Sequence, residues 1–498
     1  MLDFRQHFFE DIVTTQLGYK PSIEIKPAHL ANGFFRAVCG GYVNNEAQHQ
    51  ALYPQGYPIL GPDLARRSDK FSQFTPTQQQ ALLFLNQNNG QREILHGLLS
   101  ADKTVFKGVS TSSYSLSHAS HVTSDNHDRD AGMWLYKILS HGQTTPALDL
   151  LKELLQQEPR RRNDELSVLT LPLDDPSQTW KQKSYDNWFP VSLQIEDGIF
   201  RAPIIRNIRA AFDQLAQNDA RSSRQNGKLD TLRRMTTLAC FSVYLHLANC
   251  GNDKPIRLPI VLRLEKNGRT LHQASIASYQ WVRRSLDTFM YREIHNVVQE
   301  AFEPPSLDDE QVKALIYYKI NWYRTQSEAK TVAGQNKVKD YQDSCWRFYQ
   351  SYRGGTAIHT PQQALALAFT DVMRQVLSST PQDIARALGT RIGLLTQSEG
   401  RNKKSYQAHP DLLETLLRAT IPKGETWPLR QVGEWWASRY GIFFGILGDE
   451  NDHLASWGIP PVNGTEFSVN AAALAELLEQ SGYARRYADG VVLVTVGD

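Results

Sequence analysis

Cysteine is scarce in this chain of 498 residues: there are four, Cys39, Cys240, Cys250 and Cys345, and no two form a C-x-x-C pair. Widely spaced single cysteines exclude a disulfide framework and a cysteine-rich zinc module. They are typical of small buried thiols in a reducing compartment, so we expect a cytoplasmic protein.

Long hydrophobic runs are also missing. No apolar stretch approaches the roughly 18–20 residues that a membrane helix needs. Residues 1–17 carry Asp3, Glu10 and Asp11 among apolar side chains, whereas a signal peptide has a basic start and an uninterrupted apolar stretch. The sequence therefore predicts neither a membrane partner nor a signal peptide.

Familiar nucleotide-binding and nucleophile motifs are absent as well. The chain has no G-x-x-x-x-G-K-[ST], no G-x-G-x-x-G after a strand and no G-x-S-x-G. We therefore expect no bound cofactor, and no ATP-driven activity of this chain alone.

One polar segment, residues 110–130, leaves a catalytic alternative open. Imidazoles and carboxylates together can bind a divalent metal or serve as acid and base. The spacing H-x-x-H-x-x-x-D-x-H-D-x-D matches no common ligand pattern, and an exposed polar loop without a metal explains the same residues. The catalytic candidates are His118, His121, Asp125, His127 and Asp128.

The composition that is present is that of a folded protein, with 41% hydrophobic and 21% charged residues. A chain of this length exceeds one ordinary core, so we expect a mainly α, multidomain protein with small β elements. The expected segments are a helical domain (1–162), a mixed domain with a buried and a long helix (163–303), a basic and aromatic helical segment (304–360), and two small units (361–408 and 409–498).

Hydrophobic periodicity predicts helices over 2–17, 147–157, 204–250 and 272–302. Residues 235–249 are apolar on nearly every face, which indicates a buried helix, with His246 as a hydrogen-bonded core histidine. A strand is expected over 256–264. Ser306 and Asp309 resemble a capping box for a helix that carries Val312 and Ile320.

The last segment has the clearest order of elements. Helices are expected over 410–418 and 427–440, and a third over 469–480 with Ser468 as its N-cap. Gly482 stands where a left-handed residue ends a helix. Asp489-Gly490 separates two β-prone runs, which predicts a hairpin with a type I′ turn.

Three helices followed by a two-stranded wing is an order that resembles the winged-helix superfamily. The resemblance implies a C-terminal winged helix and fixes no activity. Residues 361–408 are a second candidate, with helices at 362–376 and 384–388, a Thr380 cap, and strands at 392–397 and 405–409 around a basic tip. A plain helical pair with a linker explains that segment equally.

Charge is unevenly distributed along the chain. Residues 405–498 hold six Lys/Arg and twelve Asp/Glu, a net charge of −6, whereas the rest hold 48 and 40, a net charge of +8. The expected third helix, 469–480, has no Lys or Arg, and only Asn470 and Gln480 are of the base-reading type. We therefore interpret this unit as a protein-docking or structural domain rather than one that binds DNA.

The basic residues gather in the middle of the chain. Residues 313–353 contain eight Lys/Arg, three Asp/Glu and nine aromatic residues. Because cations neutralise phosphates and aromatic faces stack on bases, this segment is a candidate for contact with nucleic acid. The alternative is that the aromatics form the core of an amphipathic helical pair and the cations lie on its solvent-exposed face. The nucleic-acid candidates are Lys319, Arg324, Lys337, Lys339, Arg347 and Arg353, together with Arg401, Lys403 and Lys404 at the basic tip.

These features favour a non-enzymatic scaffold or adaptor subunit of a bacterial nucleic-acid-processing complex. The basic middle would contact DNA or RNA, and the acidic end would dock a protein partner such as an ATPase or a nuclease. The chain is similar in architecture, though in no particular motif, to accessory proteins of bacterial anti-phage (antiviral) defence systems. The alternatives are a sequence-specific DNA-binding regulator and a metal-dependent nuclease using residues 118–130.

Overall fold

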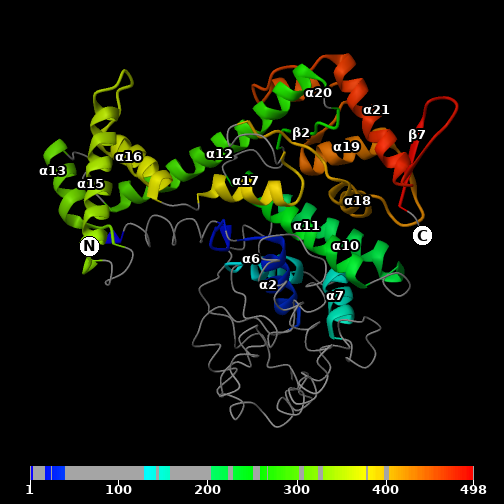
Figure 1. Cartoon of the computed structure of the whole chain (residues 1–498), viewed down its shortest axis with the longest axis horizontal. Helices are drawn as coiled ribbons and strands as arrows, with labels where there is room; N and C mark the ends of the chain where they lie inside the picture. The colour runs from blue at the N-terminus through cyan, green and yellow to red at the C-terminus, as the bar shows by residue number, and fades with distance from the viewer. Residues whose placement is uncertain are drawn as a thin grey trace, which may run out of the picture.

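The computed structural model of the chain describes residues 2–3, 17–23, 25–39, 128–141, 145–156, 203–222, 228–250, 258–265, 267–301, 308–323, 329–376, 380–396 and 403–496. This part is mainly helical with three small sheets, as the sequence predicts (Figure 1). Its helices include none long and apolar enough to cross a membrane.

The helix α11 (Lys228–Asn249) lies at the centre of the fold. Every side chain from Leu238 to Ala248 is buried, because a helix that is apolar all round is stable only when other elements cover each face. This confirms the predicted buried helix. The covering helices are α2 (Pro27–Cys39), α10 (Pro203–Ser222), α12 (Arg269–Ala301), α17 (Pro381–Arg391) and α18 (Pro410–Arg418).

Two short helices from the N-terminal part of the chain complete one side of the core. They are α6 (Ala131–Ser140) and α7 (Pro146–Gln156), and both pack against α2. The second confirms the helix expected over 147–157. The helix expected over 2–17 is wrong at its start, because Leu2–Asp3 form the strand β1; residues 4–16 lie outside the described residues.

The long helix α12 connects the two ends of the molecule. At about 1.5 Å per residue, its 33 residues span about 50 Å. Its first turn touches α21 (Gly464–Gln480), where Leu271 N donates to Glu466 at 2.8 Å. Its later turns pack against α16 (Pro361–Val376), where Arg374 pairs with Asp287. Figure 1 shows α12 running between these two regions.

A helical arm projects at one end of the long axis (Figure 1). It consists of α13 (Asp309–Ala314), the π-helical turn η8 (Leu315–Lys319), α15 (Val332–Arg353) and α16. The predicted continuous helix through Ile320 is wrong, because Ile320 lies in β3 (Ile320–Asn321) and pairs with Leu2. The cap also differs: Asp308 and Gln311 form the capping box of α13.

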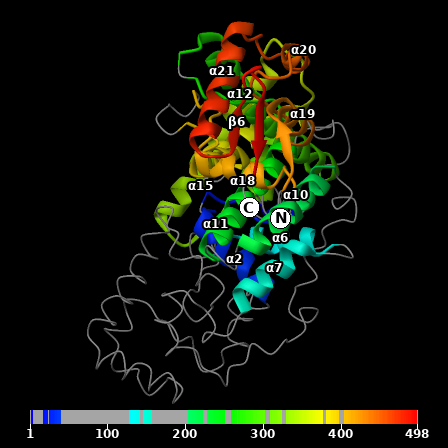
Figure 2. The ribbon, with the colours of Figure 1, turned by 90° about the vertical axis from the view of Figure 1, so that its right-hand side faces the viewer.

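The C-terminal module, residues 409–496, combines helices with a three-stranded antiparallel sheet in the order β4-β7-β6. Figure 2 shows α20 and α21 at the end of the molecule opposite α7. Along the chain the module contains α18, β4 (Thr426–Pro428), α19 (Leu429–Tyr440), β5 (Ile442–Phe443), α20 (Glu450–Ala455), α21, β6 (Ala484–Arg486) and β7 (Val492–Thr495).

Three details of this module correct the sequence predictions. Trp427 lies in β4, so the second helix begins at Leu429. The N-cap of α21 is Asn463, and Ser468 lies inside the helix. The hairpin forms, but of its turn residues only Gly490 has a positive φ (+83°). Since a type I′ turn needs two such residues, this is a longer loop with Gly490 as the left-handed residue.

The segment 361–408 forms its two predicted helices, α16 and α17, and Thr380 caps α17 by accepting from Asp383 N. The two strands expected after them reduce to one isolated bridge, Leu395–Tyr406. The strand expected over 256–264 is likewise short, since β2 comprises Ile260–Val261.

A two-stranded parallel ladder joins β2 to β5 and so ties the middle of the chain to the C-terminal module. Ile260 N donates to Gly441 O at 2.8 Å. Gly441 has φ +70°, and a Cβ there would lie 1.8 Å from Leu258 O. Only glycine fits, because the left-handed turn and the close approach of the two backbones coincide at this residue.

We expect Gly441→Ala to lower the free energy of unfolding by more than about 3 kcal/mol, because left-handed strain adds to a backbone clash. The matched control is Gly458→Ala, which has φ +67° but nothing within 4 Å of its Cβ position, so only the strain of about 1 kcal/mol applies. Denaturant unfolding measures both; equal losses would contradict the close approach.

Candidate functional site

The aromatic residues of the arm mostly face inward. Trp322 and Tyr349 are buried, and six others are half-buried. Tyr318 alone among the nine in residues 313–353 is exposed, at 78%. The structure thus favours the amphipathic core interpretation for eight of these aromatic side chains and leaves one available to a ligand.

Three acidic residues of the arm accept hydrogen bonds from tyrosine hydroxyls. The Tyr317 hydroxyl donates to Asp343 at 2.6 Å, that of Tyr349 donates to Asp309 at 2.6 Å, and that of Tyr352 donates to Asp371. Burial, followed by the hydrogen bond to Asp343, raises the pKa of Tyr317 to about 12. Asp309 and Asp343 are nonetheless exposed, and Asp309 and Asp371 also pair with Arg353 and Arg374.

Four of the candidate cations lie on the surface of the arm: Lys319, Lys337, Lys339 and Arg347. Two of them rest on aromatic rings, with Lys337 Nζ 5.8 Å from the centre of the Tyr341 ring and the Arg347 guanidinium 5.8 Å from that of Phe348. Such contacts position a cation and leave its charge exposed to solvent.

Two further candidates on this segment differ from these four. Arg353 is exposed but pairs with Asp309 at 3.3 Å and donates to His359 O at 2.7 Å. Its charge is therefore partly compensated within the arm. Arg324 lies outside the described residues.

The basic tip at 398–404 is only partly described. Arg401 lies outside the described residues, and Lys403 is exposed. Lys404 corrects the prediction: it is 5% exposed and its ammonium donates to Thr396 O. The Leu395–Tyr406 bridge draws this stretch into the core, so Lys404 is not placed to contact a phosphate.

Of the histidine and aspartate candidates, the structure describes only Asp128; His118, His121, Asp125 and His127 lie outside the described residues. Asp128 is buried, and its Oδ2 accepts from Gly132 N at 3.1 Å. It also lies against α2, since a Cβ at Gly33 would meet Asp128 Oδ2 at 1.9 Å. Asp128 therefore stabilises the first turn of α6 at the point where α6 crosses α2. No cluster of metal-ligating side chains was found in the described ranges.

His246 is a core histidine, as predicted. Its Nε2 lies 3.0 Å from Leu17 O, and its ring stacks on Trp134 with 4.5 Å between the ring centres. Burial lowers its pKa to about 4, so the imidazole is neutral at physiological pH and serves packing rather than catalysis.

A buried side chain of α21, Asn470, bonds to the middle of the chain. Asn470 Oδ1 accepts from Leu264 N at 2.7 Å and from Glu265 N at 3.0 Å. Its Nδ2 donates to Leu262 O and Phe444 O, both at 2.9 Å. Every hydrogen-bonding position of this amide is used internally, so Asn470 cannot read a base.

The exposed face of α21 carries no cation. It presents Ser468, Val469, Ala472 and Glu476, and Gln480 donates to Glu476 at 3.1 Å. A groove-reading helix needs cations for phosphates and polar side chains for base edges. This face offers no cation, and of its polar side chains Gln480 is bonded to Glu476.

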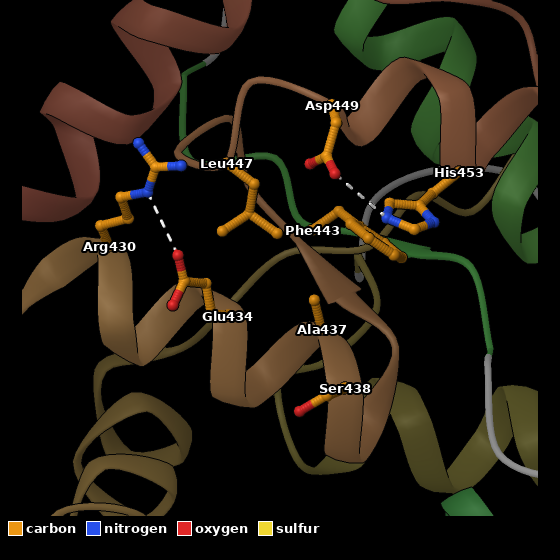
Figure 3. Close-up of a pocket in the computed structure, with 8 residues that line it drawn as sticks. All are labelled: Arg430, Glu434, Ala437, Ser438, Phe443, Leu447, Asp449 and His453. Carbon is orange, nitrogen blue, oxygen red and sulfur yellow. Dashed lines mark hydrogen bonds and ion pairs between the residues drawn. The ribbon is translucent and has the colours of Figure 1, made fainter.

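A small open pocket of about 230 Å³ lies beside α21, between α19 and α20 (Figure 3). Phe443, Ala437 and Leu447 supply its apolar surface. The rim carries the ion pair Arg430–Glu434 at 3.1 Å and His453, whose Nε2 lies 3.5 Å from Asp449 Oδ2. Ser438 on the rim donates to Trp435 O. The pocket is smaller than the roughly 300 Å³ minimum of a small-molecule site, so it suits a side chain of a partner.

Sequence reasoning missed this pocket and the buried carboxylate of Glu450, which follows the lining residue Asp449 in the sequence. Glu450 is buried, and its Oε1 accepts from Gly445 N at 2.8 Å and Ile446 N at 3.2 Å. Desolvation raises its pKa. The only local signal was the i,i+4 spacing of Asp449 and His453, which is common on exposed helices.

Comparison with protein-family models, with curated proteins and with solved structures gave no match for this chain.

We expect Asn470→Ala to lower the free energy of unfolding by about 4 kcal/mol, because four backbone groups lose their partner in a buried site. Ser468→Ala on the same helix is the control. As an exposed mid-helix residue it should change stability by less than about 0.5 kcal/mol, whereas loss of an N-cap would cost about 1 kcal/mol. Small effects at both positions in denaturant unfolding would contradict the assigned anchoring role.

The titration of His246 should make the free energy of unfolding depend on pH. Its folded pKa of about 4 lies below the unfolded value of 6.5, so the unfolded state binds the proton first as the pH falls. The stability that the folded protein gains from the neutral imidazole of His246 is therefore fully present above pH 6.5. About 3 kcal/mol of it is lost as the pH falls from 6.5 to 4. Unfolding of wild type and His246→Gln at pH 7 and pH 4.5 measures this term. The variant should lose less stability on acidification; parallel losses would contradict the assignment.

Proposed function

We propose that this chain is a non-enzymatic cytoplasmic scaffold of a bacterial nucleic-acid-processing complex. In this proposal the helical arm contacts DNA or RNA, and the C-terminal module docks a protein partner, an ATPase or nuclease of the same system. The observation that carries it is the separation of exposed charge. The arm at one end of α12 carries Lys319, Lys337, Lys339 and Arg347. The C-terminal module at the other end has six Lys/Arg and eleven Asp/Glu, a net charge of −5.

A winged-helix reading of the C-terminal module is part of the proposal. Its support is the order helix, strand, helix, helix and hairpin, with the strand β4 beside β7 in one sheet. The insertion of β5 and α20 between α19 and α21 departs from a compact helix-turn-helix. With no cation on α21 and an acidic surface, protein docking through α21 and the adjacent pocket fits this module better than groove binding.

A sequence-specific regulator has less support. The remaining candidate recognition helix is α17, whose residues Pro381 to Ala385 are buried. Arg391 donates to Ile23 O at 2.9 Å and to Ile25 O at 2.7 Å, and Arg386 pairs with Asp383 at 3.4 Å. Both arginines bond to other groups of the fold, so neither guanidinium is available for a bidentate hydrogen bond to a base.

The nuclease alternative rests on residues outside the described part. Replacing His121 and Asp125 with alanine and assaying DNA cleavage with Mg²⁺ or Mn²⁺ separates it from the scaffold. Cleavage by the wild-type protein that both replacements abolish would favour the nuclease and overturn the proposal.

Charge reversal on the arm tests the nucleic-acid contact. We expect Lys337→Glu/Lys339→Glu to weaken binding to DNA at low salt about tenfold or more, and to reduce the slope of log affinity against log salt by about 2, since each phosphate contact contributes about one. Fluorescence anisotropy titrations over a salt series measure both quantities.

The matched control reverses two cations on the acidic module, Lys423→Glu/Arg485→Glu, and should leave affinity within about twofold. Absence of salt-sensitive binding by the wild-type chain, or an equal loss in the control, would contradict the proposal.

A further inference from the structure

We propose that Tyr318 is a stacking platform for an unpaired base, so that the ligand of the arm is single-stranded nucleic acid. This inference rests on the proposed function and names the ligand class. The arm has one outward aromatic ring: Tyr318 is 78% exposed, whereas the other eight aromatics of residues 313–353 are buried or half-buried.

The environment of Tyr318 separates it from its neighbour Tyr317. The Tyr317 hydroxyl donates to Asp343, and its carbonyl accepts from Gln342 Nε2 at 3.2 Å, which fixes that residue against α15. Both tyrosines lie in the π-helical turn η8. Wider turns of this kind occur frequently at functional sites, and here the turn directs one tyrosine inward and the next outward.

A cation stands next to the exposed ring in the sequence. Lys319 follows it directly and is exposed. The contacts of α13 and η8 with α15 run antiparallel: Asp309 meets Tyr349, Lys313 lies over Trp346, and Tyr317 meets Asp343. Continuing along α15, the exposed Lys339 lies one turn beyond Asp343.

The acidic residues on this part of α15 are Asp340, which is exposed, and Asp343, which is exposed and accepts from the Tyr317 hydroxyl. Their two charges balance those of Lys319 and Lys339, and Lys319, directly beside Tyr318 in the sequence, is the exposed cation next to the ring. An exposed ring with a neighbouring cation is an arrangement that binds a single strand: the ring stacks on a base face, and the ammonium group contacts a phosphate. A duplex hides its base faces, so it would use the lysines but not the ring.

The test uses the full-length chain with two probes of about 20 nucleotides, an oligothymidylate (with an oligouridylate arm for RNA) and a mixed-sequence duplex. We expect Tyr318→Ala to weaken single-strand binding roughly tenfold and to leave duplex binding unchanged. Tyr318→Phe keeps the ring and should bind as wild type does. Tyr487→Ala, at an exposed tyrosine on the acidic module (52% exposed), is the control and should have no effect.

Unchanged single-strand binding by Tyr318→Ala, or wild-type binding to the duplex alone, would overturn this inference and leave the proposed function standing. Absence of binding to every probe would overturn both. Circular dichroism of each variant checks that the fold is retained.

Discussion

The burial of α11 along Leu238 to Ala248 is the constraint on which the rest of this structure depends. A buried helix that also carries Arg234 requires a charged partner, because an unpaired buried charge costs about 3–5 kcal/mol. Asp219 of α10 supplies it at 2.8 Å and Glu414 of α18 adds a second contact at 3.0 Å. Arg418 of α18 then reaches the same Asp219 at 3.3 Å. One shared network thus fixes α10, α11 and the start of the C-terminal module together.

The helix α12 packs against α11 and also contacts elements at both ends of the molecule. Glu466 and Asn470 of α21 hold its beginning and the adjacent residues 262–265, and Arg374 of α16 holds its later turns. The arm and the acidic module are therefore held at opposite ends of one rigid element. A protein built in this way suits joining two partners at a fixed separation, which is why a scaffold role agrees with its shape and charge.

Local patterns in the sequence were sufficient for much of the fold. The apolar character of residues 235–249, the stripe on α12 and the left-handed Gly482 (φ +77°) are set by neighbours a few positions away, and each was predicted. The errors lie where distant residues decide. Ile320 leaves its helix because Leu2 pairs with it, and Lys404 is buried because Thr396 O accepts its ammonium.

The candidate site shows the same division. Periodicity alone placed the aromatics of residues 313–353 on a helical pair, but which ring remains outside depends on the π-helical turn and on its contacts with α15. Asn470 is of the right type for base contact, and only the backbone groups of residues 262–265 explain why it is internal.

The most direct measurement of the central claim is photo-crosslinking of the full-length chain to nucleic acid, followed by mass spectrometry of the modified peptides. The account predicts adducts in peptides of the arm, residues 308–353, and none in residues 464–496. Adducts concentrated on α21 or on the β6–β7 hairpin, with an unmodified arm, would contradict it.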